Sequence, residues 1–83
     1  METEKCLHIR YYAALREAAG RAEETVRTAA ATAEDLYRER ARQYLIAYDV
    51  SRLTVALNDQ VVPWNTRVGD GDTVIFLPPY AGG

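Results

Sequence analysis

The sequence predicts an α+β fold, in which a mixed, twisted sheet carries one main helix on one face and continues into an extended carboxyl-terminal tail. Three observations support this fold class. The chain opens with alternating apolar and polar residues, its middle holds one stretch with a helical apolar face, and it closes with an apolar run before Gly82 and Gly83. The order strand, strand, helix, strand, strand suits a sheet that is covered by a helix on one side.

Composition limits the number of domains and the kinds of partner. A chain of 83 residues with 48% hydrophobic content can bury one core but not two, so we expect a single domain over residues 1–83. Its core is expected at about 6–77, with a flexible tail at 78–83. A net charge of −2 disfavours nucleic acid as a partner, since such a partner requires a strongly basic surface.

The cellular location follows from what the sequence lacks. The single cysteine, Cys6, excludes an internal disulfide framework and fits a reducing compartment. No apolar stretch approaches the ~20 residues of a membrane span, and the acidic start does not resemble a signal peptide. We therefore expect a cytoplasmic protein with no membrane partner.

The first half of the chain contains the signals of two strands and a short helix. Residues 6–12 alternate between apolar and polar, as a half-buried strand does. Residues 13–19 are rich in alanine and favour a short helix, which Gly20 ends. A second strand is predicted over residues 23–28.

The main helix is predicted to begin at Thr32, because Asp35 follows at the spacing of a capping pair. Glu34 and Asp35 then lie in the first turn, where the helix dipole favours negative charge. Apolar residues at helical spacing define one buried face over about 15 residues. The positions of this face are Leu36, Tyr37, Ala41, Tyr44, Leu45 and Tyr48.

The second half of the chain is predicted to complete the sheet. A third strand is expected over residues 52–57, a turn at 58–59 and a brief extended piece at 61–62. The glycines and aspartates of residues 69–72 predict a turn into the final strand, which covers 74–77.

A search for catalytic or metal-binding groups finds few candidates. The chain has one histidine, His8, and one cysteine, Cys6, both on the first strand. We expect them on opposite faces of that strand, which disfavours a nucleophile and base pair and a tetrahedral metal site. The sequence therefore predicts no active site and no metal within this chain.

The carboxyl-terminal tail is the strongest functional candidate. Two glycines in succession make a terminus thin enough to enter a narrow channel, and they place the Gly83 carboxylate at its tip. Residues 78–83 carry no charged side chain and reach roughly 20 Å when extended. Pro78 and Pro79 favour that extended geometry. The alternative is a frayed end without function.

Three segments resemble the MoaD/ThiS family of sulfur carriers, and within it the small subunits of molybdopterin synthase. They are LHIRYYAALRE at residues 7–17, GDGDTV at 69–74 and FLPPYAGG at 76–83. The resemblance covers nearly the whole chain, from about Cys6 to Gly83, and the ending is its most specific part. It implies a ubiquitin-like β-grasp fold, which agrees with the order of elements derived above.

The resemblance also implies a mechanism. An activating enzyme uses ATP to convert the Gly83 carboxylate into an acyl-adenylate, and sulfur then replaces AMP to leave a thiocarboxylate. The tail enters the active site of a partner, which contributes the catalytic residues, and no cofactor is bound permanently. The tail residues are Pro78, Pro79, Tyr80, Ala81, Gly82 and Gly83. Because the sequence ends at Gly83, no processing protease is expected.

The family pattern further implies the partners and a docking surface. The partners are the large subunit of molybdopterin synthase (MoaE-like), an adenylating enzyme (MoeB-like) and a sulfur donor that acts through a sulfurtransferase. The pattern places the partner interface at Tyr12, Val61 and Leu77. A heterotetramer of two small and two large subunits is implied.

Two alternatives stay open at this stage. The same carrier chemistry can serve the thiolation of tRNA, or the synthesis of thiamine, cysteine or a secondary metabolite. The domain can instead be a ubiquitin-like modifier or interaction module without sulfur chemistry.

Overall fold

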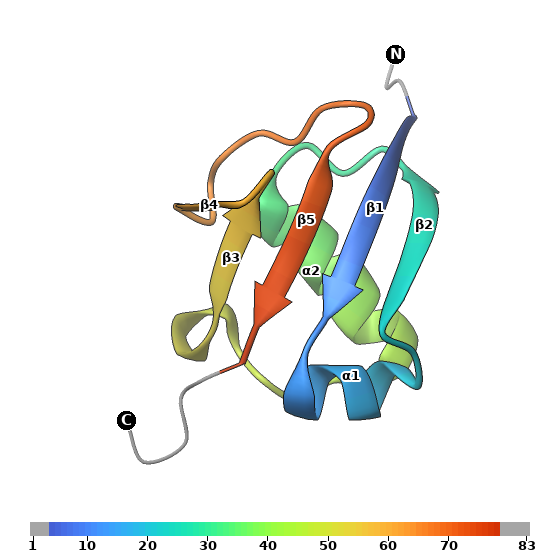
Figure 1. The fold of residues 1–83 in the computed structure, drawn as a ribbon, viewed down its shortest axis with the longest axis vertical. Coiled ribbons are helices and arrows are strands. Elements are labelled where there is room, and N and C mark those ends of the chain that lie inside the picture. Colours follow the sequence, from blue (N-terminus) through green and yellow to red (C-terminus); the bar gives the residue numbers. More distant parts are fainter. Residues whose placement is uncertain (1–3, 79–83) are drawn as a thin grey trace.

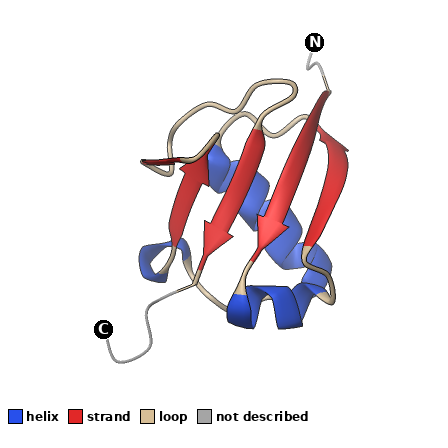
Figure 2. Cartoon of the chain, in the orientation of Figure 1, coloured by secondary structure: helices blue, strands red, loops and turns tan. Residues whose placement is uncertain are grey.

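The computed structural model describes residues 4–78 as a five-stranded sheet with one long helix across one face (Figures 1 and 2). In chain order the elements are β1 (Lys5–Tyr11), α1 (Ala13–Ala19), β2 (Glu23–Thr28), α2 (Ala33–Tyr44), the 3₁₀ turn η1 (Val50–Arg52), β3 (Thr54–Leu57), β4 (Gln60–Val62) and β5 (Thr73–Leu77). The strands lie in the order β2-β1-β5-β3-β4, and only β1 and β5 are parallel. The predicted ubiquitin-like β-grasp fold, with a mixed sheet and a helix on one face, is confirmed.

The hydrophobic core lies between the sheet and α2. The alternation predicted for the first strand is confirmed, since Leu7, Ile9 and Tyr11 are almost completely buried while Arg10 is exposed. The same alternation buries Val74 and Phe76 of β5 against these residues. From α2, alanine, leucine and tyrosine side chains close the core on the other side. They are Ala33, Leu36 and Tyr37.

The predicted end of α1 and the predicted start of α2 are both observed. α1 ends at Gly20, whose φ of 75° is the left-handed conformation that glycine adopts at low cost. α2 begins after Thr32, whose Oγ1 accepts a hydrogen bond from the backbone N–H of Asp35 at 3.1 Å. Glu34 and Asp35 lie in its first turn, as predicted.

The predicted buried face of the main helix is wrong at its carboxyl-terminal end. The helix stops at Tyr44, because Leu45 adopts a left-handed conformation with φ 58°. Leu45 is 87% exposed, and the following Ile46 is buried in its place. Tyr48 lies beyond the helix, where its backbone carbonyl accepts a hydrogen bond from the Tyr37 hydroxyl at 2.7 Å. The helical spacing of apolar residues predicted a longer buried face, because spacing alone does not show that the left-handed conformation of Leu45 ends the helix.

The third strand also begins later than predicted. Arg52 belongs to η1, and β3 starts only at Thr54. The side chain of Asp49 explains the difference, since its Oδ2 accepts a hydrogen bond from the Ser51 N–H at 3.0 Å and caps the 3₁₀ turn.

Two turns at one end of the sheet are joined by side chains. Asn58 and Asp59 both have positive φ and connect β3 to β4, as predicted for this turn. The Asn58 amide donates to Asp72 at 2.9 Å, and its oxygen accepts from the Thr73 N–H at 3.0 Å. Asp72 also accepts from the Gly69 N–H at 2.7 Å. The predicted turn at residues 69–72 therefore fixes the start of β5 next to β3.

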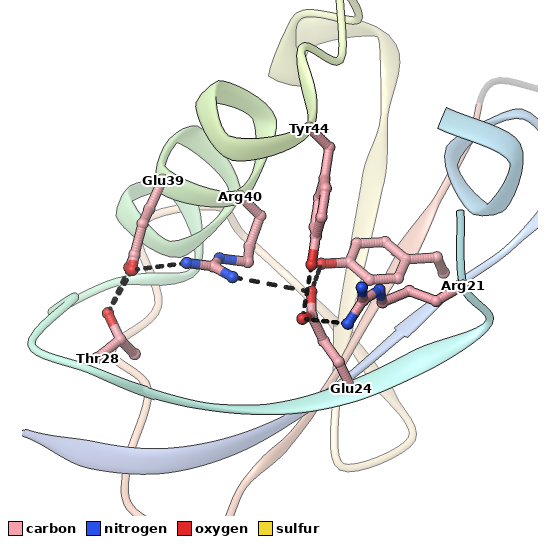
Figure 3. Close-up of polar contacts among 7 residues, drawn as sticks. Arg21, Glu24, Thr28, Glu39, Arg40 and Tyr44 are labelled. Atoms are coloured by element: carbon pink, nitrogen blue, oxygen red, sulfur yellow. Dashed lines mark hydrogen bonds and ion pairs between the residues drawn. The ribbon is translucent and has the colours of Figure 1, made fainter. Parts of the chain in front are cut away.

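A buried carboxylate connects β2 to β1 and α2 (Figure 3). Glu24 has a side chain only 9% exposed, and it accepts hydrogen bonds from the hydroxyls of Tyr11 at 2.5 Å and Tyr44 at 2.7 Å. Arg21 lies 3.5 Å from one of its oxygens and Arg40 lies 3.8 Å from the other. Two donors and two cations compensate the loss of hydration that a buried carboxylate suffers.

A second polar contact reinforces the same interface further along β2. The Thr28 hydroxyl contacts the Glu39 carboxylate of α2, with 2.5 Å to Oε1 and 2.8 Å to Oε2 (Figure 3). Glu39 also lies 3.6 Å from Arg40, so polar contacts link Glu24 and Thr28 of β2 through α2.

We predict that Glu24→Ala lowers the free energy of unfolding by about 3 kcal/mol, because it leaves two buried hydroxyls without their acceptor and two arginines without their counter-charge. Urea unfolding followed by circular dichroism measures this change. The matched control is Glu23→Ala on the same strand, whose side chain is 56% exposed and whose loss should cost under about 1 kcal/mol. Equal losses in the two variants would contradict the role assigned to Glu24.

We further predict that stability falls above about pH 10, where the tyrosines of the unfolded chain ionise. Burial and the hydrogen bond to Glu24 raise the pKa of Tyr11 and of Tyr44, so the folded state keeps both hydroxyls protonated after the unfolded state has released its protons. Their stabilising contribution is therefore complete below about pH 10 and declines as the pH rises further. Tyr11→Phe should reduce the slope of unfolding free energy against pH by about 1.4 kcal/mol per unit in this range. Urea unfolding of the wild-type and Tyr11→Phe chains at a series of pH values measures this slope.

Candidate functional site

The predicted tail begins at the end of the central strand of the sheet. β5 lies between β1 and β3, and its last residue, Leu77, is followed by the half-buried Pro78 (Figure 1). The rest of the predicted tail lies outside the described residues. These positions are Pro79, Tyr80, Ala81, Gly82 and Gly83. A central strand is hydrogen-bonded on both sides, so the tail starts from a fixed point of the fold.

An aromatic cluster on the α2 side of the sheet fixes the end of β5. Phe76 is completely buried and contacts Tyr37 of α2 in an edge-on arrangement, with ring centroids 5.2 Å apart. Trp64 stacks on Phe76 at 6.0 Å, and Tyr11 of β1 lies 6.1 Å away. The Trp64 indole N–H donates to the Leu53 carbonyl at 3.4 Å. Aromatic packing of this kind fixes the residue directly before Leu77.

The surface of the sheet opposite α2, which we name the open sheet face, carries an apolar row. Strand alternation turns Val74 and Phe76 into the core, so Ile75 and Leu77 point to the open face. Cα pairing places Ala56 beside Ile75 and Val61 beside Ala56. Tyr11 of β1 is paired with Phe76 of β5, so Tyr12 and Leu77, the residues that follow them in the chain, are also neighbours. The apolar residues of the open sheet face are Tyr12, Ala56, Val61, Ile75 and Leu77.

The structure places the three predicted interface residues on this one face. Tyr12 is 39% exposed and Val61 is 70% exposed, while Leu77 is half-buried. Their role as an interface stays a prediction. Sequence reasoning missed Ile75 and Ala56, although Ile75 is two residues before Leu77 in the same strand and therefore shares its face.

The open sheet face also contains a polar recess of about 500 Å³. His8 lines this recess and contacts two residues of β2. Its Nε2 lies 2.7 Å from the Glu23 carboxylate, and its Nδ1 lies 3.2 Å from the Thr25 hydroxyl. The residues that line this recess are His8, Arg10, Glu23, Asn58, Asp59 and Thr73. The recess adjoins the apolar row, because Arg10 is paired with Ile75.

The expectation that Cys6 and His8 lie on opposite faces of the first strand is wrong. Residues two apart on a strand share a face, and both lie on the side opposite the buried Leu7. Cys6 is paired with Arg27 and His8 with Thr25, two pairs further along the ladder. His8 makes its contacts with Thr25 and Glu23, as described above.

Residues 4–78 contain neither a group of metal ligands nor a helix that could span a membrane. In that part of the chain no three histidine, cysteine, aspartate or glutamate side chains come close enough together to hold a metal ion. Neither described helix combines the length and the apolar character needed to span a membrane.

Comparison with known proteins gives a consistent result. The sequence profile of the ThiS family matches residues 9–83. The molybdopterin synthase sulfur carrier subunit of Haemophilus influenzae is 31% identical over 81 residues, which cover 93% of this chain and 99% of that protein.

Several solved structures share the fold. A putative molybdopterin converting factor, subunit 1, from Pyrococcus furiosus superposes with a TM-score of 0.75 at 27% identity, covering 92% of this chain and 99% of that one. The small archaeal modifier protein 1 from Methanosarcina acetivorans superposes with a TM-score of 0.77, covering 98% and 99%. Its identity is only 20%, so this second likeness concerns the fold alone.

Proposed function

The chain belongs to the ThiS family, and from this premise we propose that it is a sulfur carrier that acts as the small subunit of a molybdopterin synthase. The observation that carries the proposal is the family match, which extends through Gly82 and Gly83 to the last residue. The similarity to the sulfur carrier subunit of Haemophilus influenzae over nearly its full length supports the choice of pathway.

The proposed chemistry takes place at the Gly83 carboxylate. A carboxylate is a poor electrophile, so an adenylating enzyme first transfers AMP from ATP to it and releases pyrophosphate. The resulting acyl-adenylate is a mixed anhydride with a good leaving group. The outer sulfur of a sulfurtransferase persulfide then attacks the acyl carbon and displaces AMP. A second thiol cleaves the resulting acyl disulfide, which leaves a thiocarboxylate on Gly83 and a disulfide on the donor side. We place this chemistry in the cytoplasm.

The large subunit of the synthase is the proposed recipient of the tail. The thiocarboxylate sulfur is nucleophilic and is delivered to a cyclic pyranopterin phosphate, which receives two sulfurs to form a dithiolene. Within residues 4–78 the fold supports this role in two ways: it fixes the start of the tail at Leu77, and it presents an apolar row on the open sheet face beside that point. Tyr12, Val61 and Leu77 are the proposed contacts with the large subunit.

We expect the full chain, incubated with a MoaD-type adenylating enzyme, ATP and a sulfur donor, to gain the mass that corresponds to the replacement of one oxygen by sulfur. Intact-mass spectrometry measures this gain. A chain that lacks Gly83 should gain nothing while its circular dichroism spectrum stays unchanged, and a chain that lacks Met1 is the matched control and should react fully. Failure of the full chain to react would favour a modifier or interaction module.

We also expect Leu77→Glu to weaken binding to the large subunit at least ten-fold, because it places a charge within a desolvated apolar contact. Calorimetric titration measures the affinity, and the melting temperature reports on folding. The matched control is Leu45→Glu, since Leu45 lies 87% exposed at the end of α2, away from the open sheet face. Unchanged affinity of Leu77→Glu would remove Leu77 from the interface.

A further inference from the structure

Arg10, a cationic residue without an ion-pair partner among residues 4–78, lies beside the apolar row of the open sheet face. Arg10 is exposed and lies beside Ile75 on the parallel strand β5. Its guanidinium carbon lies 5.7 Å from the centre of the Tyr12 ring, so the charged group is turned toward the apolar row and the end of β5. No carboxylate within residues 4–78 forms an ion pair with it.

The carboxylate best placed to neutralise Arg10 is engaged elsewhere. Glu23 is the direct cross-strand neighbour of Arg10 on β2. Its Oε1 nevertheless lies 2.7 Å from Nε2 of His8, which lines the same recess. Arg10 therefore stacks on Tyr12 instead of pairing with Glu23, and its planar group of hydrogen-bond donors stays available.

We infer that Arg10 determines partner specificity on the open sheet face and that the partner presents a carboxylate to it; this inference rests on the proposed function. Arg10 is paired with Ile75 across the strands and stacks on the Tyr12 ring. Any protein that covers the apolar row must therefore also cover Arg10. A cation that is buried without a counter-charge opposes binding strongly, whereas a carboxylate can bind the guanidinium through two parallel hydrogen bonds.

This arrangement selects partners by rejection as well as by attraction. The apolar row alone would accept many apolar surfaces, since contact of this kind is not directional. A surface that lacks an acidic residue at the right position leaves Arg10 unpaired and is disfavoured. The partner surface is therefore apolar, with a single acidic residue opposite Arg10.

The test is calorimetric titration of the cognate large subunit with the wild-type chain, Arg10→Met, Glu23→Gln and Arg42→Met. Arg10→Met keeps the apolar length of the side chain but removes the charge, and it should weaken binding by about 30-fold, as expected when one member of a buried charge pair is lost. Arg42 is an exposed arginine of α2, on the other side of the sheet, so Arg42→Met is the matched control and should bind as the wild type does. Glu23→Gln should also bind as the wild type does, because Glu23 is paired with His8.

A charge exchange identifies the carboxylate. Arg10→Glu should abolish binding, and replacing the acidic residues of the large subunit with lysine one at a time should yield one variant that restores it. Wild-type affinity of Arg10→Met would overturn the inference, and so would a loss in Glu23→Gln as large as that in Arg10→Met. The proposed function is judged separately by thiocarboxylate formation on the wild-type chain. If that reaction occurs while Arg10→Met binds normally, only the specificity role of Arg10 fails.

Discussion

The pairing of β5 between β1 and β3 is the constraint on which the rest of the structure depends. This one strand contributes Phe76 to the centre of the core and Leu77 to the open sheet face, and the chain leaves the sheet directly after it. Packing on the α2 side of the strand thus fixes the residue after which the predicted tail begins. The Asn58 and Asp72 contacts fix the other end of the same strand, so β5 is held at both ends.

The polar interactions of the interior gather between the sheet and α2. Burying the Glu24 carboxylate costs hydration, but two tyrosine hydroxyls and two arginines surround it. Tyr11 comes from β1, Tyr44 and Arg40 come from α2, and Arg21 precedes β2. The network therefore specifies how β1, β2 and α2 meet, which apolar packing alone leaves less defined. Arg21 and Arg40 are engaged in this network, whereas Arg10, the one arginine of β1, lies on the open sheet face.

The sequence predicted the parts of the fold that depend on local patterns. Alternation identified β1, the capping pair at Thr32 identified the start of α2, and glycine identified the end of α1. The errors arose where a local pattern conflicts with longer-range structure. Leu45 fits the helical spacing, yet the chain reverses there so that Ile46 enters the core. The Glu24 network joins residues 13 to 20 positions apart, and no single-sequence pattern reports such contacts.

The two parts of the candidate site, the tail and the open sheet face, differ in how far the sequence alone predicts them. The tail is a contiguous motif, so its chemistry is readable from the last residues alone. The proposed recognition surface is distributed, because Arg10 and Tyr12 meet Ile75 only through the parallel pairing of β1 with β5. Under the proposed function, substitutions on the open sheet face can therefore change which protein receives the tail without changing the reaction at Gly83. The proposal thus assigns the reactive group and the surface that selects the partner to separate parts of the chain.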